Sequence, residues 1–108
     1  MTTDNFEERR RAFENKFAHD AELQFRVEAR RDRYMAQWAA EILGKSDAES
    51  DEYIKEVIRA DFEEAGDEDV IRKLKTDLEG KVTEKEIRAR IAEATIRAKG
   101  EIIDQGEF

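Results

Sequence analysis

Three arginines at helical spacing are the residues of this sequence best placed to bind a partner. Arg26, Arg30 and Arg33 are four and three positions apart, so on a helix they share one face. A guanidinium forms paired hydrogen bonds with carboxylates and phosphates. We therefore predict that this face can contact an acidic partner or a phosphate. The simpler interpretation is that it is solvated or pairs with acidic helices of the chain itself.

The chain offers little for catalysis. It has no cysteine, which excludes a thiolate nucleophile, and a single histidine, which excludes any site that needs two imidazoles. No serine lies near His19 in the sequence, so this histidine lacks the partners of a catalytic base and is expected at a hinge or cap. The triplet Gly44-Lys45-Ser46 resembles the end of a phosphate-binding loop, but the glycine required five positions earlier is Ala39. We predict that the protein is not an enzyme.

No metal or cofactor site is predicted. The segment Asp61–Asp69 holds six carboxylates in nine residues, but a calcium-binding loop that began at Asp61 would need ligands where Ala65 and Arg72 stand. A helix end followed by an acid-rich helix start explains the segment better. Two alternatives stay open: loose divalent-ion binding at this segment and weak nucleotide binding elsewhere on the protein.

Charge excludes further classes of function. The 108 residues are 44% charged, and 28 acidic against 20 basic side chains give a net charge of −8. Such a balance argues against binding to nucleic acid phosphates or to an anionic membrane. The uncharged runs are too short to span a bilayer, and the sequence does not start as a secretory signal. We expect a cytoplasmic protein that is not integral to the membrane.

Helix boundaries are marked by capping residues and glycines. Ser46 with Glu49, and Thr83 with Glu86, have the spacing of capping boxes, in which each side chain bonds the other residue's backbone N–H. Gly66 is the residue type that ends a helix in the left-handed conformation. There is no proline to interrupt the pattern. The predicted helices span residues 21–43, 47–65, 68–79 and 84–103.

Each predicted helix carries a one-sided apolar stripe, and the connecting loops are short, which indicates an all-α, small antiparallel four-helix bundle. Tyr34 and Trp38 are interpreted as core residues, with an aromatic ligand pocket as the alternative. Asp67 is expected to cap the third of these helices. The stripes consist of Leu23, Val27, Tyr34, Trp38 and Ile42; Ile54, Val57, Ile58 and Phe62; Val70, Ile71, Leu74 and Leu78; and Ile87, Ile91, Ala94, Ala98 and Ile102.

The N-terminal residues differ from the bundle. Phe6, Phe13 and Phe17 lie seven and four positions apart and share one seam of a helix. A helix this short, with so narrow an apolar stripe, is marginal alone in water. We predict a mobile, partly helical arm over residues 1–19, disordered when free, and a four-helix bundle over residues 20–108. The arm either folds back on the bundle as a fifth, loosely held helix or orders when it inserts into a groove of another protein.

Four segments of the chain carry a family resemblance: Ala12–Asp20, Glu28–Arg31, Trp38–Glu41 and Ala60–Val70. They are similar to the alphaproteobacterial zeta subunit of the F-type ATP synthase, and the resemblance covers about residues 6–79. It implies an inhibitor of ATP hydrolysis whose arm enters a catalytic interface between the alpha and beta subunits, next to the gamma shaft. It also implies a bundle that anchors outside this interface, and a protein peripheral to the inner membrane through the synthase.

On this resemblance, the arm binds the alpha, beta and gamma subunits, and the free protein is a monomer. The arginine face of the bundle is then a secondary docking candidate. Two other functions stay open: a small nucleotide- or ligand-sensing helical domain, and a non-inhibitory adaptor with a packed arm. The partner-binding residues expected on the arm are Phe6, Arg10, Phe13, Glu14, Lys16 and Phe17.

Overall fold

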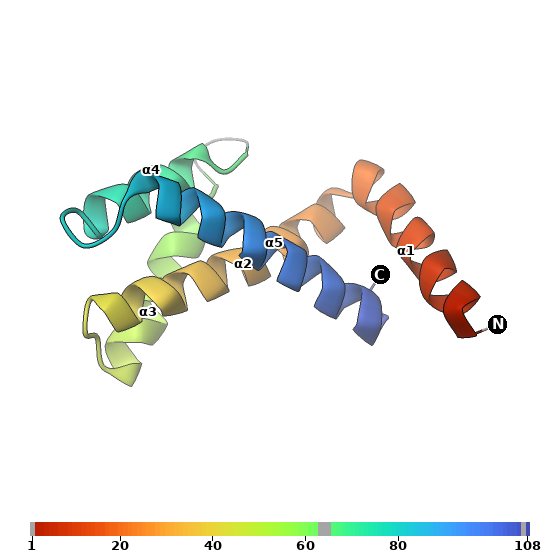
Figure 1. Ribbon diagram of the computed structural model, residues 1–108, viewed down its shortest axis with the longest axis horizontal. Coiled ribbons are helices and arrows are strands. Elements are labelled where there is room, and N and C mark those ends of the chain that lie inside the picture. The colour runs from red at the N-terminus through yellow and green to blue at the C-terminus, as the bar shows by residue number, and fades with distance from the viewer. Residues whose placement is uncertain (1, 63–65, 107) are drawn as a thin grey trace.

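The computed structural model describes residues 2–62, 66–106 and 108, and the secondary structure within these ranges is helical (Figure 1). The predicted all-α class is therefore confirmed. The helices lie close to the predicted ranges, with the arm as an additional helix in front of them. They are α1 (Thr2–His19), α2 (Ala21–Ile42), α3 (Asp47–Ala60), α4 (Glu68–Asp77) and α5 (Glu84–Gln105).

Local capping starts the helices where the sequence predicts. The Ser46 hydroxyl accepts a hydrogen bond from the Glu49 N–H at 3.3 Å, and the Glu49 carboxylate accepts one from the Ser46 N–H at 2.9 Å. The same reciprocal pair forms between Thr83 and Glu86. Asp20 caps α2 by accepting a bond from the backbone N–H three residues on, at 3.1 Å. These bonds satisfy amides that the first turn of a helix leaves without a partner.

The end of α3 differs from the prediction. The helix stops at Ala60, not at residue 65, and Phe62 is 61% exposed, so its predicted place in the core stripe is wrong. Gly66 has a φ of +86°, as expected for a left-handed residue. Asp67 precedes α4 but makes no capping bond, because its carboxylate accepts a bond from Arg31 at 3.0 Å instead.

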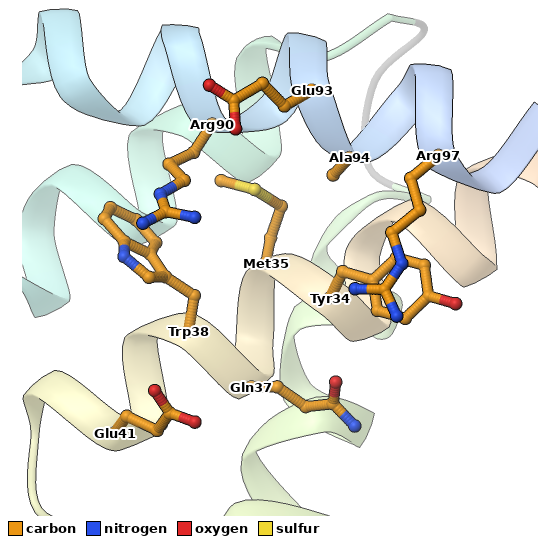
Figure 2. A pocket seen from close by; sticks show the side chains of 9 residues that line it. All are labelled: Tyr34, Met35, Gln37, Trp38, Glu41, Arg90, Glu93, Ala94 and Arg97. Carbon is orange, nitrogen blue, oxygen red and sulfur yellow. The ribbon is translucent and has the colours of Figure 1, made fainter.

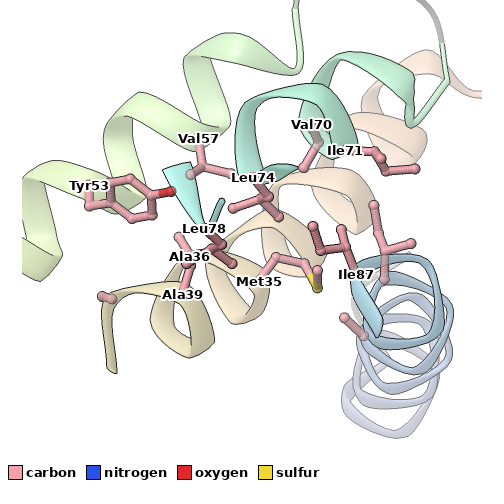
Figure 3. Close-up of a cluster of buried hydrophobic side chains, with 13 residues drawn as sticks. Met35, Ala36, Ala39, Tyr53, Val57, Val70, Ile71, Leu74, Leu78 and Ile87 are labelled. Carbon is pink, nitrogen blue, oxygen red and sulfur yellow. The ribbon is translucent and has the colours of Figure 1, made fainter. Parts of the chain in front are cut away.

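The main core lies where α2, α3, α4 and α5 meet, and it forms the left part of the molecule in Figure 1. Figure 3 shows how its side chains converge: Met35 and Ala36 from α2, Val57 from α3 and Leu74 from α4 point into one cluster. This cluster confirms the stripe predicted around α4 and part of those predicted for α3 and α5. On α2 the positions buried in this cluster differ from the predicted ones, because Tyr34, Trp38 and Ile42 are only partly buried against the cluster. Its buried members are Met35, Ala36, Ala39, Ala40, Tyr53, Val57, Val70, Ile71, Leu74, Leu78, Ile87, Ile91 and Ala94.

A second buried cluster lies between α1, the first turns of α2 and the last turns of α5. Figure 1 shows α1 beside the C-terminal end of α5, at the opposite end of the molecule from α3. Phe13 from α1 has no exposed surface and packs among aliphatic side chains of the other two helices. Phe17 and Phe108 cover the edge of this cluster. The buried members are Phe13, Leu23, Val27, Ala98, Ile102 and Ile103.

Candidate functional site

The arm is joined to the bundle through one residue. Asp20 is extended, with φ −112° and ψ 104°, and it separates the end of α1 from the start of α2. Two contacts bridge the joint: the Gln24 amide donates to the Phe17 carbonyl at 2.8 Å, and the Lys16 ammonium lies 3.7 Å from the Asp20 carboxylate. A single non-helical residue between two helices can act as a hinge, because a change in its dihedral angles re-aims the whole of α1.

The predicted aromatic seam of the arm is divided in the structure. The rings of Phe13 and Phe17 stack with centroids 5.6 Å apart, as their spacing of four predicts. Phe108 meets Phe13 edge to face at 5.4 Å. Phe6 lies apart from this group, 42% exposed, with the guanidinium of Arg9 over its ring. In this structure α1 therefore folds back on the bundle through Phe13, and the mobility of the arm stays a prediction.

Of the charged residues predicted for partner binding, Arg10 and Lys16 flank the aromatic seam of α1, three positions to either side of Phe13, and Glu14 lies farther round the helix. Arg10, Glu14 and Lys16 are exposed, and of these Lys16 approaches Asp20 at the hinge. The helix thus has one apolar face against the bundle and one charged face toward solvent. A groove that replaced the bundle would have to cover the first face, and charged groups at its rim would meet the second.

The arginine face of α2 is partly occupied. The Arg30 guanidinium lies 3.7 Å from the Glu101 carboxylate and donates to the Gln105 side chain at 3.4 Å, both on α5. The interpretation that these arginines pair with the chain's own helices therefore holds for Arg30. Arg33 is exposed and Arg26 is half-buried.

A surface cleft of about 310 Å³ lies along the contact between α2 and α5. Figure 2 shows that Tyr34 and Trp38 line it from α2, each beside an arginine of α5. The Arg97 guanidinium lies 3.8 Å from the centre of the Tyr34 ring, and that of Arg90 lies 5.4 Å from the centre of the Trp38 ring. The Tyr34 hydroxyl donates to Glu101. Both aromatic residues are half-buried at the edge of the core, so their predicted place inside it is only partly right.

The chemistry of this cleft gives the ligand-sensor alternative little support. A planar ligand would stack on an aromatic ring, but a guanidinium already lies over each of the two rings in a cation–π contact. Glu41 and Glu93 also line the cleft and balance the charges of the two arginines, so the lining has no net positive charge to attract an anionic ligand such as a phosphate. The arrangement fits a seam that holds α2 to α5.

Sequence reasoning missed a buried ion network centred on Arg31. Its guanidinium donates to Asp32 at 3.0 Å, to Asp61 at 3.1 Å and to Asp67 at 3.0 Å, and so ties α2 to the end of α3 and the start of α4. Arg31 and Asp32 are 3% and 0% exposed. The sequence contained one sign of this network. Arg31 lies four residues after Val27, so it falls on the apolar stripe of its helix, where a charged side chain needs a partner.

The network sets three carboxyl groups against the single positive charge of Arg31. Burial raises the pKa of Asp32 to about 8, and a hydrogen bond with the Asp61 carboxyl adds to this, while Arg31 opposes it. Within the described part of the chain, one oxygen each of Asp32 and Asp61 is buried without a donor from another residue. A proton held between the two would satisfy both. No group of three or more metal-ligating side chains is found among the described residues.

Comparison with known proteins identifies the family. The described residues contain no helix long and apolar enough to cross a membrane. No curated protein matches the chain. A structure determined by solution NMR is 49% identical, covers 77% of this chain and 98% of its own, and superposes with a TM-score of 0.70. A sequence model of the family described as ATPase inhibitor subunit zeta matches residues 1–101. The chain therefore belongs to the ATPase inhibitor subunit zeta family, which supports the regulatory role, as an ATPase inhibitor, that its sequence predicts.

Proposed function

We propose that the protein inhibits ATP hydrolysis by the F-type ATP synthase by inserting residues 1–19, as a helix, into a catalytic interface between the alpha and beta subunits next to the gamma shaft. Family membership supports the target. The observation that carries the mechanism is α1 itself, a separate helix hinged at Asp20 with an apolar and a charged face. The protein then acts at the cytoplasmic side of the inner membrane, held there by the synthase.

The contacts of α1 suggest how insertion works. Ordering a free arm of about fifteen residues costs about 15–30 kcal/mol at about 1–2 kcal/mol per residue, far more than three phenylalanines return on burial. In this structure the second cluster covers the Phe13–Phe17 face of α1, and the arm is helical there. A catalytic interface would have to cover the same face. The bundle and the synthase therefore compete for α1, and only released α1 can bind the synthase.

The charged face of α1 offers the test. Purified protein is added to the catalytic F1 sector of the synthase prepared without this subunit, and ATP hydrolysis is measured. The wild type is expected to inhibit. The double variant Arg10→Ala with Lys16→Ala is expected to inhibit less than the wild type. The difference between the two should be larger at low ionic strength, because exposed charges at an interface steer association. Lys85→Ala is the matched control, because Lys85 is an exposed basic residue of α5 that belongs to none of the predicted binding surfaces. Equal inhibition by the wild type and the double variant would contradict the proposed role of this face.

The adaptor with a permanently packed arm is the second candidate, and the complete burial of Phe13 favours it. Hydrogen exchange on the free protein separates the two functions. An inhibitor that releases α1 exchanges the amides around Phe13 faster than those around Met35 in the main core. An adaptor with a packed arm protects both segments to the same degree.

A further inference from the structure

Two phenylalanines stack on each other at the surface of the bundle. The rings of Phe25, on α2, and Phe62, just after α3, have centroids 5.3 Å apart and planes 15° apart. Phe25 is 44% exposed and Phe62 is 61% exposed, and neither belongs to the two core clusters. Each ring shields one face of the other, and both side chains still expose a large part of their surface. Paired exposed rings are unusual on a soluble domain, where such groups tend to mark a binding surface.

Carboxylates lie on both sides of Phe25 along α2. Glu22 and Glu28 each lie three positions from Phe25, one turn to either side on α2. Asp67, with its side chain 49% exposed, lies near Glu28, because its charge acts on that carboxyl. Burial, followed by repulsion from Asp61, raises the pKa of Glu28. The negative charge around Glu28 is therefore crowded.

The nearest buried cation is already engaged. Arg31 donates to three carboxylates at 3.0 to 3.1 Å, so it has little left to offer the carboxylates around the rings. An apolar centre with a charged rim is the usual composition of a protein–protein interface, and an excess of one sign at the rim selects a partner of the other sign.

We infer that Phe25 and Phe62, with Glu22, Glu28 and Asp67 around them, form a docking surface for a basic, arginine-containing segment of a partner subunit. An arginine of the partner can lie over an exposed ring while its guanidinium pairs with a neighbouring carboxylate. The chain uses the same contact internally, where Arg97 lies over Tyr34 and close to Glu101. Arg26, Arg30 and Arg33 would select the opposite partner, an acidic one.

The inference rests on the proposed function, because the partner is taken to be a subunit of the synthase. A bundle held at this surface keeps α1 near its own site at a high local concentration, so two weak contacts bind as one strong contact. Loss of the docking surface is therefore expected to raise the protein concentration needed for inhibition. It is not expected to abolish inhibition at saturation.

Affinity for the purified F1 sector, measured by surface-immobilised binding, tests the rings. The full-length protein with Phe25→Ser and Phe62→Ser is expected to bind about tenfold more weakly or worse, because aromatic anchors dominate interface affinity. The single variant Phe62→Ser is measured as well, because Phe62 lies beyond the end of α3 and its replacement is not expected to unfold the protein. Ile96→Ser is the matched control, since Ile96 is an apolar residue of α5 that is 73% exposed. Wild-type affinity in both phenylalanine variants would overturn the inference.

The charge of the partner is tested separately. Glu22→Gln with Glu28→Gln is expected to slow association and to reduce its dependence on salt, whereas Arg33→Gln leaves both unchanged. The reverse result would assign docking to the arginine face and overturn the inference. A photo-crosslinking benzoyl group introduced on Phe62 is expected to capture a peptide of the F1 sector rich in lysine and arginine. Capture of an acidic peptide, or of a second copy of this chain, would equally overturn it.

The two proposals fail in different ways. If the wild-type protein binds the F1 sector but never inhibits hydrolysis, the proposed function is wrong, and the phenylalanine variants still decide the docking surface. If inhibition depends on Arg10 and Lys16 but not on Phe25 and Phe62, the proposed function stands and the docking surface is wrong.

Discussion

At the scale of single residues, the Arg31 network shows how the fold connects elements that the sequence separates. One guanidinium holds carboxylates from α2, from the end of α3 and from the residue before α4. Desolvation offsets most of the attraction in such a buried pair, but removal of one partner leaves unpaired buried charge, which costs about 3–5 kcal/mol. The network therefore fixes the position of the α3–α4 connection more than it adds net stability.

The buried carboxyl of Asp32 predicts a pH dependence of stability. Its pKa rises from an ordinary 3.8 to about 8, first through burial, so between these values the folded state keeps a proton that the unfolded chain releases. Stability contributed by this group is complete below about pH 4 and is lost as the pH rises toward 8. Asp32→Asn keeps the neutral form and is expected to flatten this decline. The free energy of unfolding from urea titrations at pH 5 and pH 8 measures it.

The matched control for this prediction is Asp104→Asn, an exposed aspartate near the end of α5. It should leave the difference between the two pH values as in the wild type. A wild type that is more stable at pH 8 than at pH 5 would show that Asp32 is ionised in the folded protein, with its charge held by Arg31.

The residue scale also marks what sequence can and cannot predict. Ser46 and Glu49 are three positions apart, so a capping box is visible in the sequence alone. Asp67 also has the sequence features of a cap, but it turns to Arg31, which is distant in the chain. A local motif is reliable only while no stronger partner comes near in the fold. Arg31 on an apolar stripe was the visible sign that such a partner exists.

At the scale of elements, the connection between α3 and α4 contains Gly66 in the left-handed conformation. The glycine has a φ of +86°, and a Cβ added to it would meet no atom within 4 Å. Gly66→Val therefore tests backbone conformation without a steric clash and is expected to destabilise the protein by about 1–2 kcal/mol. Chemical denaturation monitored by circular dichroism gives the value.

Gly100 is the control for this substitution. It lies within α5, has equally open space around its Cα and no positive φ, so Gly100→Ala is expected to be neutral or to stabilise. If the free energy of unfolding of Gly66→Val equalled that of Gly100→Ala, the left-handed conformation of Gly66 would not be needed for folding.

The packing of α1 depends on a contact that no local pattern could predict. Phe13 and Phe108 come from opposite ends of the sequence and meet edge to face at 5.4 Å. Residue 108 also lies beyond the residues that match the family. Phe108→Ala is expected to speed amide exchange in α1 and to lower the protein concentration needed for inhibition, because a larger released fraction raises the apparent affinity. Phe6→Ala removes an exposed ring of the same helix and should leave the exchange rates unchanged. Unchanged exchange in Phe108→Ala would mean that Phe108 does not hold α1.

At the scale of the whole molecule, the residues that stabilise the fold and those proposed for inhibition are only partly separated between the main core and the second cluster. Among the residues whose burial is described, the main core contains none from α1, which explains why a four-helix bundle could be predicted from the stripes of the other helices. The second cluster depends on Phe13, so α1 also covers apolar side chains of α2 and α5. The sequence showed the amphipathic arm but could not show which surface covers its apolar face, since the bundle and a partner groove satisfy that face equally well.

Deletion of residues 1–19 separates the two roles. The truncated protein is expected to stay folded on the main core and to lose inhibition of ATP hydrolysis. Because Leu23 and Ile102 become exposed, it should also lose about 1.5–3 kcal/mol for each large side chain uncovered. Melting temperature and hydrolysis rate are measured on the same samples. Phe13→Ala should show a smaller loss of stability than the deletion and a partial loss of inhibition. If the truncated protein still inhibits at the wild-type concentration, α1 is not the inhibitory element, and a surface of the bundle must then block the synthase by itself.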